Sequence, residues 1–339
     1  MIEKLEEKLT ELSENFEDFA IVFTQVDPDA VGAALGLSFA IENLTGKSTE
    51  MYYGGSIGHP QNKALFNLHN LKSIIKPLKT MEVSVDCAYF LVDSCTVQDA
   101  RLGELNGVFV PHVVVDHHRG EDLPEGTFRW IEEVGAVSTL IVELLDSLGL
   151  LNSSLPKEVM SSLALGIHTD TGALTSCTPR DLTAYSNIMR YLVGNELISL
   201  MNYRRPPSFF EHMKRALDNK ERKGAILIAD VGEVLLGEAD NISTIADELM
   251  LMDGLSLVVV WGVVDGNVRL SIRNSDISNP LDDWITERFQ GFGGSKMTPK
   301  GVAQGGANIP FEFGFWSKKA PKKAYELVKE TLRNLTFGE

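Results

Sequence analysis

The sequence is poor in cysteine, has no long apolar run and carries fewer basic than acidic side chains. Its three cysteines, Cys87, Cys95 and Cys177, are odd in number and widely spaced, which predicts no disulfide framework and favours a reducing compartment. No apolar run reaches the length of a membrane span, and the opening residues MIEKLEEKLTELSENFEDF are too charged for a signal peptide. We therefore expect a cytoplasmic protein with no membrane partner.

The shortage of positive charge also limits the nucleic acids that this chain can bind. Acidic side chains outnumber basic ones by 47 to 31, which gives a formal net charge of −16 over 339 residues. Proteins that bind duplex nucleic acid neutralise its phosphates with many lysines and arginines, so we expect no long duplex among the partners. Residues 291–339 form a local exception, with eight Lys or Arg against four Glu. That end suits a small anionic substrate.

Short apolar runs that end in polar or acidic residues dominate the first 200 residues. They are continuous rather than alternating, which is typical of strands covered on both faces, and stretches of helical spacing separate them. Repeated strand and helix predict a parallel α/β sheet. The expected strands are 20–27, 87–94 and 112–118, and the expected helices include 30–44 and 136–149. An amphipathic N-terminal helix, with Leu5, Leu9 and Leu12 on one face, has either this domain or a second subunit to pack against.

The pattern changes near residue 200, where MNYRRPPSFF interrupts the helical spacing with two prolines and two arginines, as a linker does. Three further strands are expected at 224–230, 255–266 and 267–274, the last two joined by a hairpin at Asp265-Gly266-Asn267. We predict a catalytic domain at 1–200, a linker at 201–220 and a smaller α/β domain at 221–339.

Aspartates and histidines gather where strands are expected to end. One aspartate alone is as well explained as a helix cap. Several carboxylates in one layer repel one another unless a cation neutralises them, and oxygen-rich ligands with few imidazoles suit Mn²⁺ or Mg²⁺ better than zinc. Two such ions can activate water and clamp a phosphoryl group, which predicts hydrolysis of phosphoesters or phosphoanhydrides. The residues concerned are Asp27, Asp29, Asp93, Asp116, His117, His118 and Asp170.

These segments resemble the four motifs of the DHH phosphoesterase superfamily. VDPDAVGAAL, LVDS, VVVDHH and GIHTDTGAL match them in order and span residues 23–181. The superfamily includes RecJ exonuclease, family II pyrophosphatase, exopolyphosphatases and the nanoRNase/pAp phosphatase group, and this chain is most similar to the last. The resemblance implies a parallel-sheet domain, an associated C-terminal domain that binds substrate, and an active-site cleft between the two.

The resemblance also implies a role for each matching residue. Asp93 would bridge two Mn²⁺ ions, with Mg²⁺ as the alternative. Asp29, His117 and Asp170 would complete one site, and Asp27 would belong to the other. Asp116 would orient the neighbouring histidine, and His118 would face the substrate phosphate, where it stabilises charge or assists the leaving group.

The first motif departs from the family pattern. Family members commonly have a metal-binding histidine either four or two residues before the first aspartate, where this chain has Phe23 and Gln25. Phenylalanine cannot coordinate a metal, and a glutamine carbonyl is a weak, neutral ligand. A catalytically weakened nucleotide-binding or sensing protein with one metal site is therefore an alternative.

Further residues are candidates for substrate contacts. In NVRLSIRNS, the alternation puts Arg269, Ser271 and Arg273 on one face, either to bind phosphate or simply to face solvent. A glycine-rich loop at 289–311 holds Gly293, Gly294 and Ser295, which resemble the Gly-Gly-His motif of the family with serine in place of histidine. His59 lies in a loop that is near the metals in relatives, although a loop histidine is often merely exposed. Phe292, Phe311, Phe313 and Trp316 are available for base stacking.

Other histidines and charged residues are assigned structural roles. His112 and His168 lie in apolar runs, and Pro179 and Asp181 mark an ordinary helix start beside Arg180. The preferred function is a hydrolase acting on very short RNA or on a nucleotide such as pAp. A RecJ-like single-strand exonuclease and a pyrophosphatase or exopolyphosphatase are alternatives. A homodimer is expected from the family resemblance and the N-terminal helix.

Overall fold

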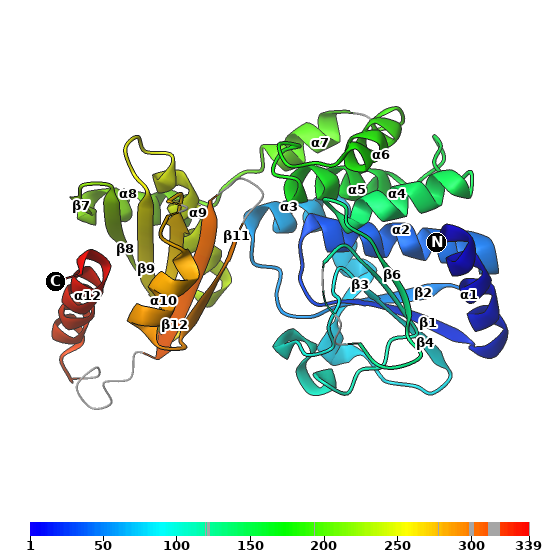
Figure 1. The fold of residues 1–339 in the computed structure, drawn as a ribbon, viewed down its shortest axis with the longest axis horizontal. Helices are drawn as coiled ribbons and strands as arrows, with labels where there is room; N and C mark the ends of the chain where they lie inside the picture. The colour runs from blue at the N-terminus through cyan, green and yellow to red at the C-terminus, as the bar shows by residue number, and fades with distance from the viewer. Residues whose placement is uncertain are drawn as a thin grey trace. The chain divides into compact units, whose positions relative to one another are not determined.

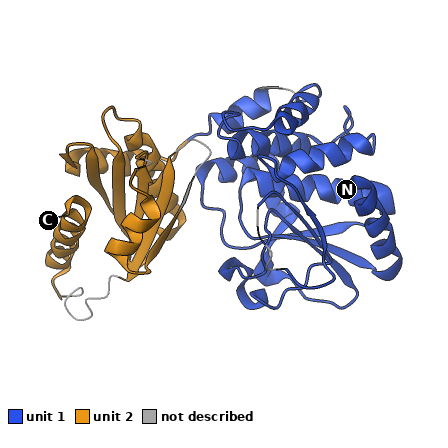
Figure 2. Ribbon diagram, viewed as in Figure 1, with its two compact units in different colours: residues 1–204 blue, residues 205–339 orange. Residues whose placement is uncertain are grey.

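The computed structural model describes residues 1–118, 120, 123–192, 194–276, 278–297, 302–310 and 319–338. The chain divides into two compact units, Met1–Arg204 and Arg205–Glu339 (Figure 2). In these described ranges, none of the helices combines the length and the apolar character needed to cross a bilayer. All three cysteines are free thiols, as expected.

The first unit is built on a six-stranded sheet in the order β3-β2-β1-β4-β5-β6, and every pairing in it is parallel. The strands are β1 (Asp18–Phe23), β2 (Thr49–Tyr53), β3 (Ile75–Pro77), β4 (Cys87–Val92), β5 (Val113–Asp116) and β6 (Phe128–Ile131). The chain adds strands on one side of β1 and then on the other, which places the switch point between β1 and β4. The α/β fold with a parallel sheet is confirmed.

A layer of helices covers one face of this sheet (Figure 1). The helices of the unit are α1 (Ile2–Asn15), α2 (Pro28–Thr45), α3 (Pro60–Leu68), α4 (Val137–Ser147), α5 (Lys157–Asp170), α6 (Pro179–Met189) and α7 (Gly194–Met201). Helix α2 is apolar and buried over most of its length because it packs against α4 and α5 as well as the sheet. A Cβ at Gly32 would lie 2.9 Å from the backbone of Ser162 and Leu163, so glycine is what allows α2 and α5 to approach this closely.

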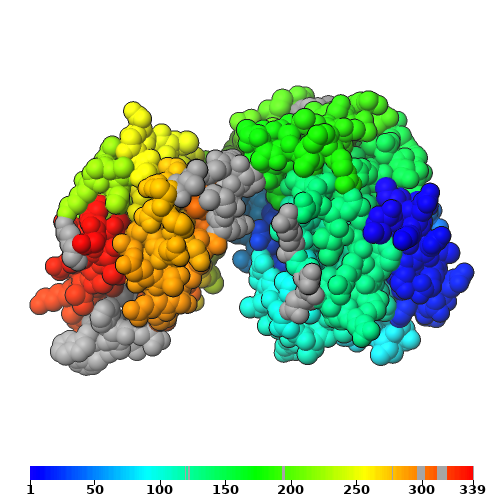
Figure 3. Space-filling model, in the orientation of Figure 1, coloured from blue at the N-terminus to red at the C-terminus, as the bar shows by residue number. Residues whose placement is uncertain are grey.

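The N-terminal helix α1, dark blue in Figure 3, lies on the outside of the first unit with its apolar face inward. Leu5, Leu9 and Leu12 are buried in the same core as α2. The helix therefore packs on its own domain, the first of the two alternatives, and not through these leucines on a second subunit. The expected homodimer therefore gains no support from these leucines.

The second unit is a mixed six-stranded sheet in the order β11-β12-β10-β9-β8-β7. Its strands are β7 (Glu221–Lys223), β8 (Ile226–Val234), β9 (Leu257–Val264), β10 (Asn267–Asn274), β11 (Gly293–Met297) and β12 (Ala303–Pro310). Helices α8 (Pro207–Asn219) and α9 (Asp240–Met250) pack on one face, and α10 (Leu281–Phe289) and α12 (Pro321–Phe337) pack on the other. The predicted hairpin joins β9 to β10, with positive φ at both Asp265 and Gly266, as a tight turn of this kind requires.

Two segments differ from the sequence-based expectation. The stretch 201–220, expected to be a linker, contains the helix α8, which packs on β8. The glycine-rich stretch, expected to be a loop, contributes β11 and β12, which pair with each other at the sheet edge. Glycine is required there by packing, because a Cβ on Gly305 would lie 2.3 Å from Cδ1 of Ile285 in α10.

Candidate metal centre

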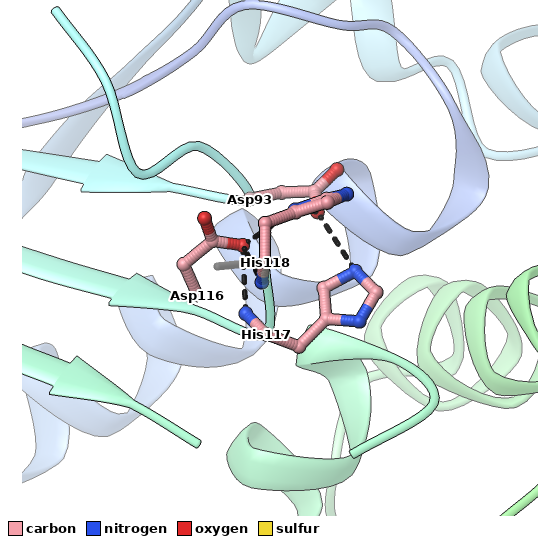
Figure 4. Close-up of side chains that lie close together, drawn as sticks. All are labelled: Asp93, Asp116, His117 and His118. Atoms are coloured by element: carbon pink, nitrogen blue, oxygen red, sulfur yellow. Dashed lines mark hydrogen bonds and ion pairs between the residues drawn. The ribbon is translucent and has the colours of Figure 1, made fainter. Parts of the chain in front are cut away.

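Two neighbouring strands deliver the middle of the predicted acidic cluster at the carboxyl edge of the first sheet, where its parallel strands end (Figure 4). Asp116 is the last residue of β5, and His117 and His118 follow it. Asp93 follows β4 with a φ of 54°, a left-handed conformation that aspartate tolerates better than most residues. Its N–H donates to the carbonyl of Val115 at 3.1 Å, which ties the turn to the neighbouring strand.

Asp27 and Asp29 stand at the start of α2, just beyond the end of β1. Asp27 is the N-cap and accepts from the N–H of Ala30 at 3.0 Å, so the simple capping role is real. Asp29 is completely buried and accepts from the N–H groups of Val137 and Ser138, at 2.7 and 2.8 Å. Those donors open α4, so this carboxylate stabilises the N-terminus of a second helix.

Asp170 reaches the cluster from a helix, and not from a strand end as the sequence suggested. It is the last residue of α5, which brings it to the carboxyl edge from the helical layer above the sheet. The apolar run before it, LALGI, is helical because it packs between α2, α4 and α6. A short apolar run fits either element, and here tertiary packing decides.

These side chains surround the ring of His117. Its Nε2 lies 3.5 Å from Oδ1 of Asp93, 3.7 Å from Oδ2 of Asp170 and 3.8 Å from Oδ2 of Asp29. Ligand atoms of Asp29, His117 and Asp170 all lie within 4.8 Å of one another, and so do those of Asp93, Asp116, His117 and His118. The structure thus brings together six of the seven predicted residues, and Asp27 belongs to neither set.

The two histidine rings are held by different partners. Nδ1 of His117 lies 3.2 Å from the carbonyl oxygen of Val134, a contact that requires Nδ1–H and leaves the lone pair of Nε2 toward the carboxylates. Asp116 contacts the other ring, with Oδ1 2.8 Å from Nδ1 of His118, and it also accepts from the N–H groups of both histidines. Asp116 therefore fixes the turn and the ring of His118, and Val134 fixes the ring of His117.

The electrostatics of this cluster are unfavourable without a cation. Burial raises the pKa of Asp29, although the charge of His117 acts in the opposite direction. The pKa of Asp170 is raised well above its usual value, first by burial and then by the charges of Asp29, Asp27 and Asp93. Burial alone would lower the pKa of His117, but the neighbouring carboxylates outweigh it and raise that pKa. Burial and the neighbouring carboxylates together make Asp29 and Asp170 resist ionisation.

The donor set fits a divalent cation. Among the described residues, the buried atoms Nε2 of His117 and Oδ2 of Asp116 have no hydrogen-bond partner, and a buried polar atom without one is costly. Carboxylate oxygens with one or two imidazoles are ligands that Mn²⁺ and Mg²⁺ accept. The residues present could therefore bind metal.

The first-motif positions have a different local structure from the one a histidine ligand would need. Phe23 is fully buried in β1. Gln25 donates from Nε2 to Oδ2 of Asp27 at 2.8 Å and accepts at Oε1 from Nη1 of Arg101 at 2.9 Å. Both functional atoms of the Gln25 amide are thus engaged. Arg101, which also holds Asp99 through a bidentate pair, was not singled out in the sequence because no motif spacing points to it.

The remaining predicted site residues lie apart from the cluster or in the other unit. His59 caps α3 by accepting at Nδ1 from the N–H of Gln61, and its ring packs against Tyr203. Gly293, Gly294 and Ser295 lie in β11 of the second unit. Of the aromatic residues proposed for stacking, Phe292 is half exposed, and the other three, Phe311, Phe313 and Trp316, lie outside the described residues.

Arg273 is not on an open polar face. The predicted alternation is correct, but α9 covers that face, and Arg273 is 4% exposed. Its guanidinium pairs with Asp247 at 2.6 Å and also donates to Oγ of Ser271 and to the carbonyl of Ser243. The solvent-facing alternative is wrong, and a phosphate contact would have to compete with Asp247.

The helix start after the fourth motif is structural, as predicted. Arg180 pairs with Glu132 and Glu143, each at 2.6 Å. Asp181 is buried in a capping box and accepts from the N–H groups of Thr178 and Gly135 and from the hydroxyl of Thr139. These contacts tie α6 to α4 and to the segment after β6.

Comparison with known proteins extends these observations. No known family profile matches the chain. An uncharacterized protein of Methanocaldococcus jannaschii is 28% identical over 333 residues, which cover 96% of this chain, and the chain spans 65% of the length of that relative. RecJ of Thermus thermophilus, solved in complex with Mn²⁺, gives a TM-score of 0.48 at 16% identity over 89% of this chain and 52% of RecJ. The crystal structure of an exopolyphosphatase-related protein from Bacteroides fragilis gives a TM-score of 0.69 at 15% identity, and covers 98% of this chain and 97% of that one. The chain therefore has the fold of an exopolyphosphatase-related protein.

Proposed function

We propose that the chain is a metal-dependent phosphoesterase of the DHH type, with Mn²⁺ as its metal, that hydrolyses short oligoribonucleotides or nucleotide phosphates such as pAp. The observation that carries the proposal is the buried Nε2 of His117 among three carboxylates at the carboxyl edge of the sheet. The order of the four motifs and the fold shared with an exopolyphosphatase-related protein support it.

Two cations bound by Asp29, Asp93, His117 and Asp170, with Asp27 at the second position, would lower the pKa of a water molecule and neutralise the phosphoryl oxygens. The protein supplies ligands that are already oriented. Asp29 is fixed by the N-terminal amides of α4, and the ring of His117 is fixed by the carbonyl of Val134. Such preorganisation avoids reorganisation during the reaction.

His118 is positioned to handle a proton. Its side chain is 54% exposed, and its Nδ1 is 2.8 Å from the buried carboxylate of Asp116. A proton on Nδ1 held by Asp116 leaves Nε2 to give a proton to, or take one from, a leaving oxygen in the open part of the centre.

One observation favours a second candidate function. Arg101 donates to the oxygen of the Gln25 amide, and the nitrogen of this amide donates to Asp27. Gln25, at a position where family members commonly have a metal-binding histidine, therefore has no atom free to bind a metal. If the second ion does not bind, the protein would keep a single ion, at Asp29, His117 and Asp170. It would then be a nucleotide-binding or sensing protein.

Metal content and a substrate panel test these proposals. We expect two Mn²⁺ per chain, and hydrolysis of a diribonucleotide and pAp that EDTA abolishes. Asp93→Ala should lose the activity, whereas Asp86→Ala, which removes an exposed aspartate of the same unit, should retain it. One ion with tight nucleotide binding and no turnover would establish the sensing alternative. Turnover confined to pyrophosphate or polyphosphate would instead establish a pyrophosphatase or exopolyphosphatase. Turnover confined to a thirty-residue single strand would establish a RecJ-like exonuclease.

A further inference from the structure

The first unit has a pocket, partly lined by Arg101, to which the proposed metal centre assigns no role. It has a volume of about 680 Å³, within the range of pockets that hold small organic ligands. It is lined by the end of β2 and the loop after it (53–57), by the end of β3 and the residues after it (77–83), and by the 3₁₀ segment Ala100–Leu105. Lys72, from the 3₁₀ turn Leu71–Ser73 before β3, completes the lining. The pocket therefore lies over the β2-β3 half of the carboxyl edge, whereas the metal ligands lie over β1, β4 and β5.

Glycines bring the walls of this pocket together. A Cβ on Gly54 would lie 2.6 Å from the carbonyl oxygen of Arg101, so only glycine lets the loop after β2 pack directly on the 3₁₀ segment. Gly103, inside that segment, has a φ of 61° and a ψ of −124°, a conformation that only glycine adopts readily. No atom lies within 4 Å of the place where its side chain would be, so the backbone borders open space.

The pocket is positively charged in an acidic protein. Lys72, Lys79 and Arg101 line it with one acid, Glu104. Arg101 is already paired with Asp99, so the two lysines supply the excess positive charge. Within the described ranges, neither Lys72 nor Lys79 makes a hydrogen bond or an ion pair, although most arginines of the chain are paired. Two free ammonium groups at one cavity are suited to phosphate or another anion.

The rest of the lining is apolar and suits the body of a nucleoside. Tyr53, Leu78, Met81, Leu102 and Leu105 contribute to the wall. The ring of Tyr53 packs edge-on against Phe66 at 6.2 Å, which holds it in place. A wholly inorganic anion such as polyphosphate would leave this apolar surface unused, whereas a base and sugar would cover it.

Hydrogen bonds connect the pocket to the metal centre. Arg101 in the pocket wall donates to Gln25, and Gln25 donates to Asp27. A ligand at Arg101 is therefore linked to Asp27, the aspartate assigned to the second ion, through two side chains, Arg101 and Gln25.

We propose that this pocket binds a nucleoside phosphate, with its phosphate at Lys72 and Lys79 and its base against the apolar wall. In the hydrolase proposed above, on which this assignment of a substrate subsite rests, the pocket takes the nucleotide next to the phosphoryl group that reacts. The metal ligands take no part in holding this nucleotide.

Binding of AMP to the EDTA-treated full chain tests the pocket without catalysis. We expect Lys72→Ala/Lys79→Ala to weaken AMP binding about tenfold or more. Lys4→Ala/Lys47→Ala is the matched control, since it removes the same charge from the same unit outside the pocket and should bind AMP normally. Ser56→Trp, which fills the pocket from its rim, should also weaken binding, and Asp93→Ala should not.

The proposal is overturned if Lys72→Ala/Lys79→Ala and the control Lys4→Ala/Lys47→Ala bind AMP with equal affinity. It is also overturned if the two lysines are needed to bind tripolyphosphate but not to bind AMP. With Mn²⁺ bound, Lys72→Ala/Lys79→Ala should lower kcat/KM for a diribonucleotide about tenfold relative to that for bis(4-nitrophenyl) phosphate, which contains no nucleoside. If AMP binding follows the lysines but no phosphoester is hydrolysed, the pocket stands and the hydrolase proposal fails. If the diribonucleotide is hydrolysed without any effect of the lysines, the hydrolase stands and the pocket proposal fails.

Discussion

Replacing Asp170 by asparagine should stabilise the metal-free protein and remove most of its stabilisation by Mn²⁺. Oxygens of Asp29 and Asp170 lie within 4.8 Å of each other. At an effective dielectric constant of about 20, two charges 4.8 Å apart repel by about 3.5 kcal/mol. A protonated His117, 3.7 Å from Asp170, attracts it by about 4.5 kcal/mol in the same relation and more than offsets this one pair. Desolvation and the repulsion by Asp27 and Asp93 remain, and they account for the raised pKa of Asp170.

The net gain on removing this charge is about 1–2 kcal/mol, or roughly 2–8 °C in the melting temperature of a unit of this size. The assay is thermal unfolding of wild type and Asp170→Asn at pH 8, with EDTA and with saturating Mn²⁺. At a metal concentration a hundred times Kd, the wild type should gain about 2.7 kcal/mol. The variant should gain much less, so the order of stability reverses. Asp86→Asn, an exposed charge removal, is the control. A variant that melts below the wild type in EDTA, or that gains as much from Mn²⁺, would refute this reasoning.

Three further substitutions or treatments test contacts described above. Asp181→Ala should lower the free energy of unfolding in urea by about 3–5 kcal/mol, because it leaves three buried donors without an acceptor. Asp181→Asn should lower it less. Equal losses would show that the carboxylate geometry is unimportant. Burial raises the pKa of Cys87 to about 11, so a thiol reagent at pH 8 should modify Cys177 in the native protein and Cys87 only after denaturation; two rapidly reacting thiols that include Cys87 would contradict this. Gln25→His should tighten binding of the second Mn²⁺ about tenfold, measured by calorimetry, because imidazole is a better ligand than an amide; an unchanged isotherm would mean that this position does not reach the metal.

The sequence predicted that the middle of the Asp/His cluster would come together, because strand topology places those residues. Asp93 and Asp116 end two parallel strands, and parallel neighbours must end at the same edge. Asp170 was expected to follow the same rule and does not. Its apolar run is short enough for a strand, and only its packing between three helices makes it helical.

The second unit shows a different limit to prediction from the sequence. Alternation along β10 correctly put Arg273 and Ser271 on one face, but no local pattern shows that α9 folds over that face and brings Asp247 onto the guanidinium. The glycines of β11 and β12 were interpreted as a phosphate-binding loop from composition. Gly305 is required by the side chain of Ile285 in α10, a contact between segments that composition cannot reveal.

The position of Asp29 has a consequence for the order in which the protein is made. This carboxylate takes its hydrogen bonds from Val137, which lies 108 residues further along the chain, and shares its cluster with Asp170, further still. Until the ribosome has added Asp170, the growing chain lacks one carboxylate of the cluster. Until it has added α4, Asp29 lacks the amides that hold it. A metal ion that uses these ligands would therefore be held firmly only late in synthesis, when the whole first unit is present to close around it.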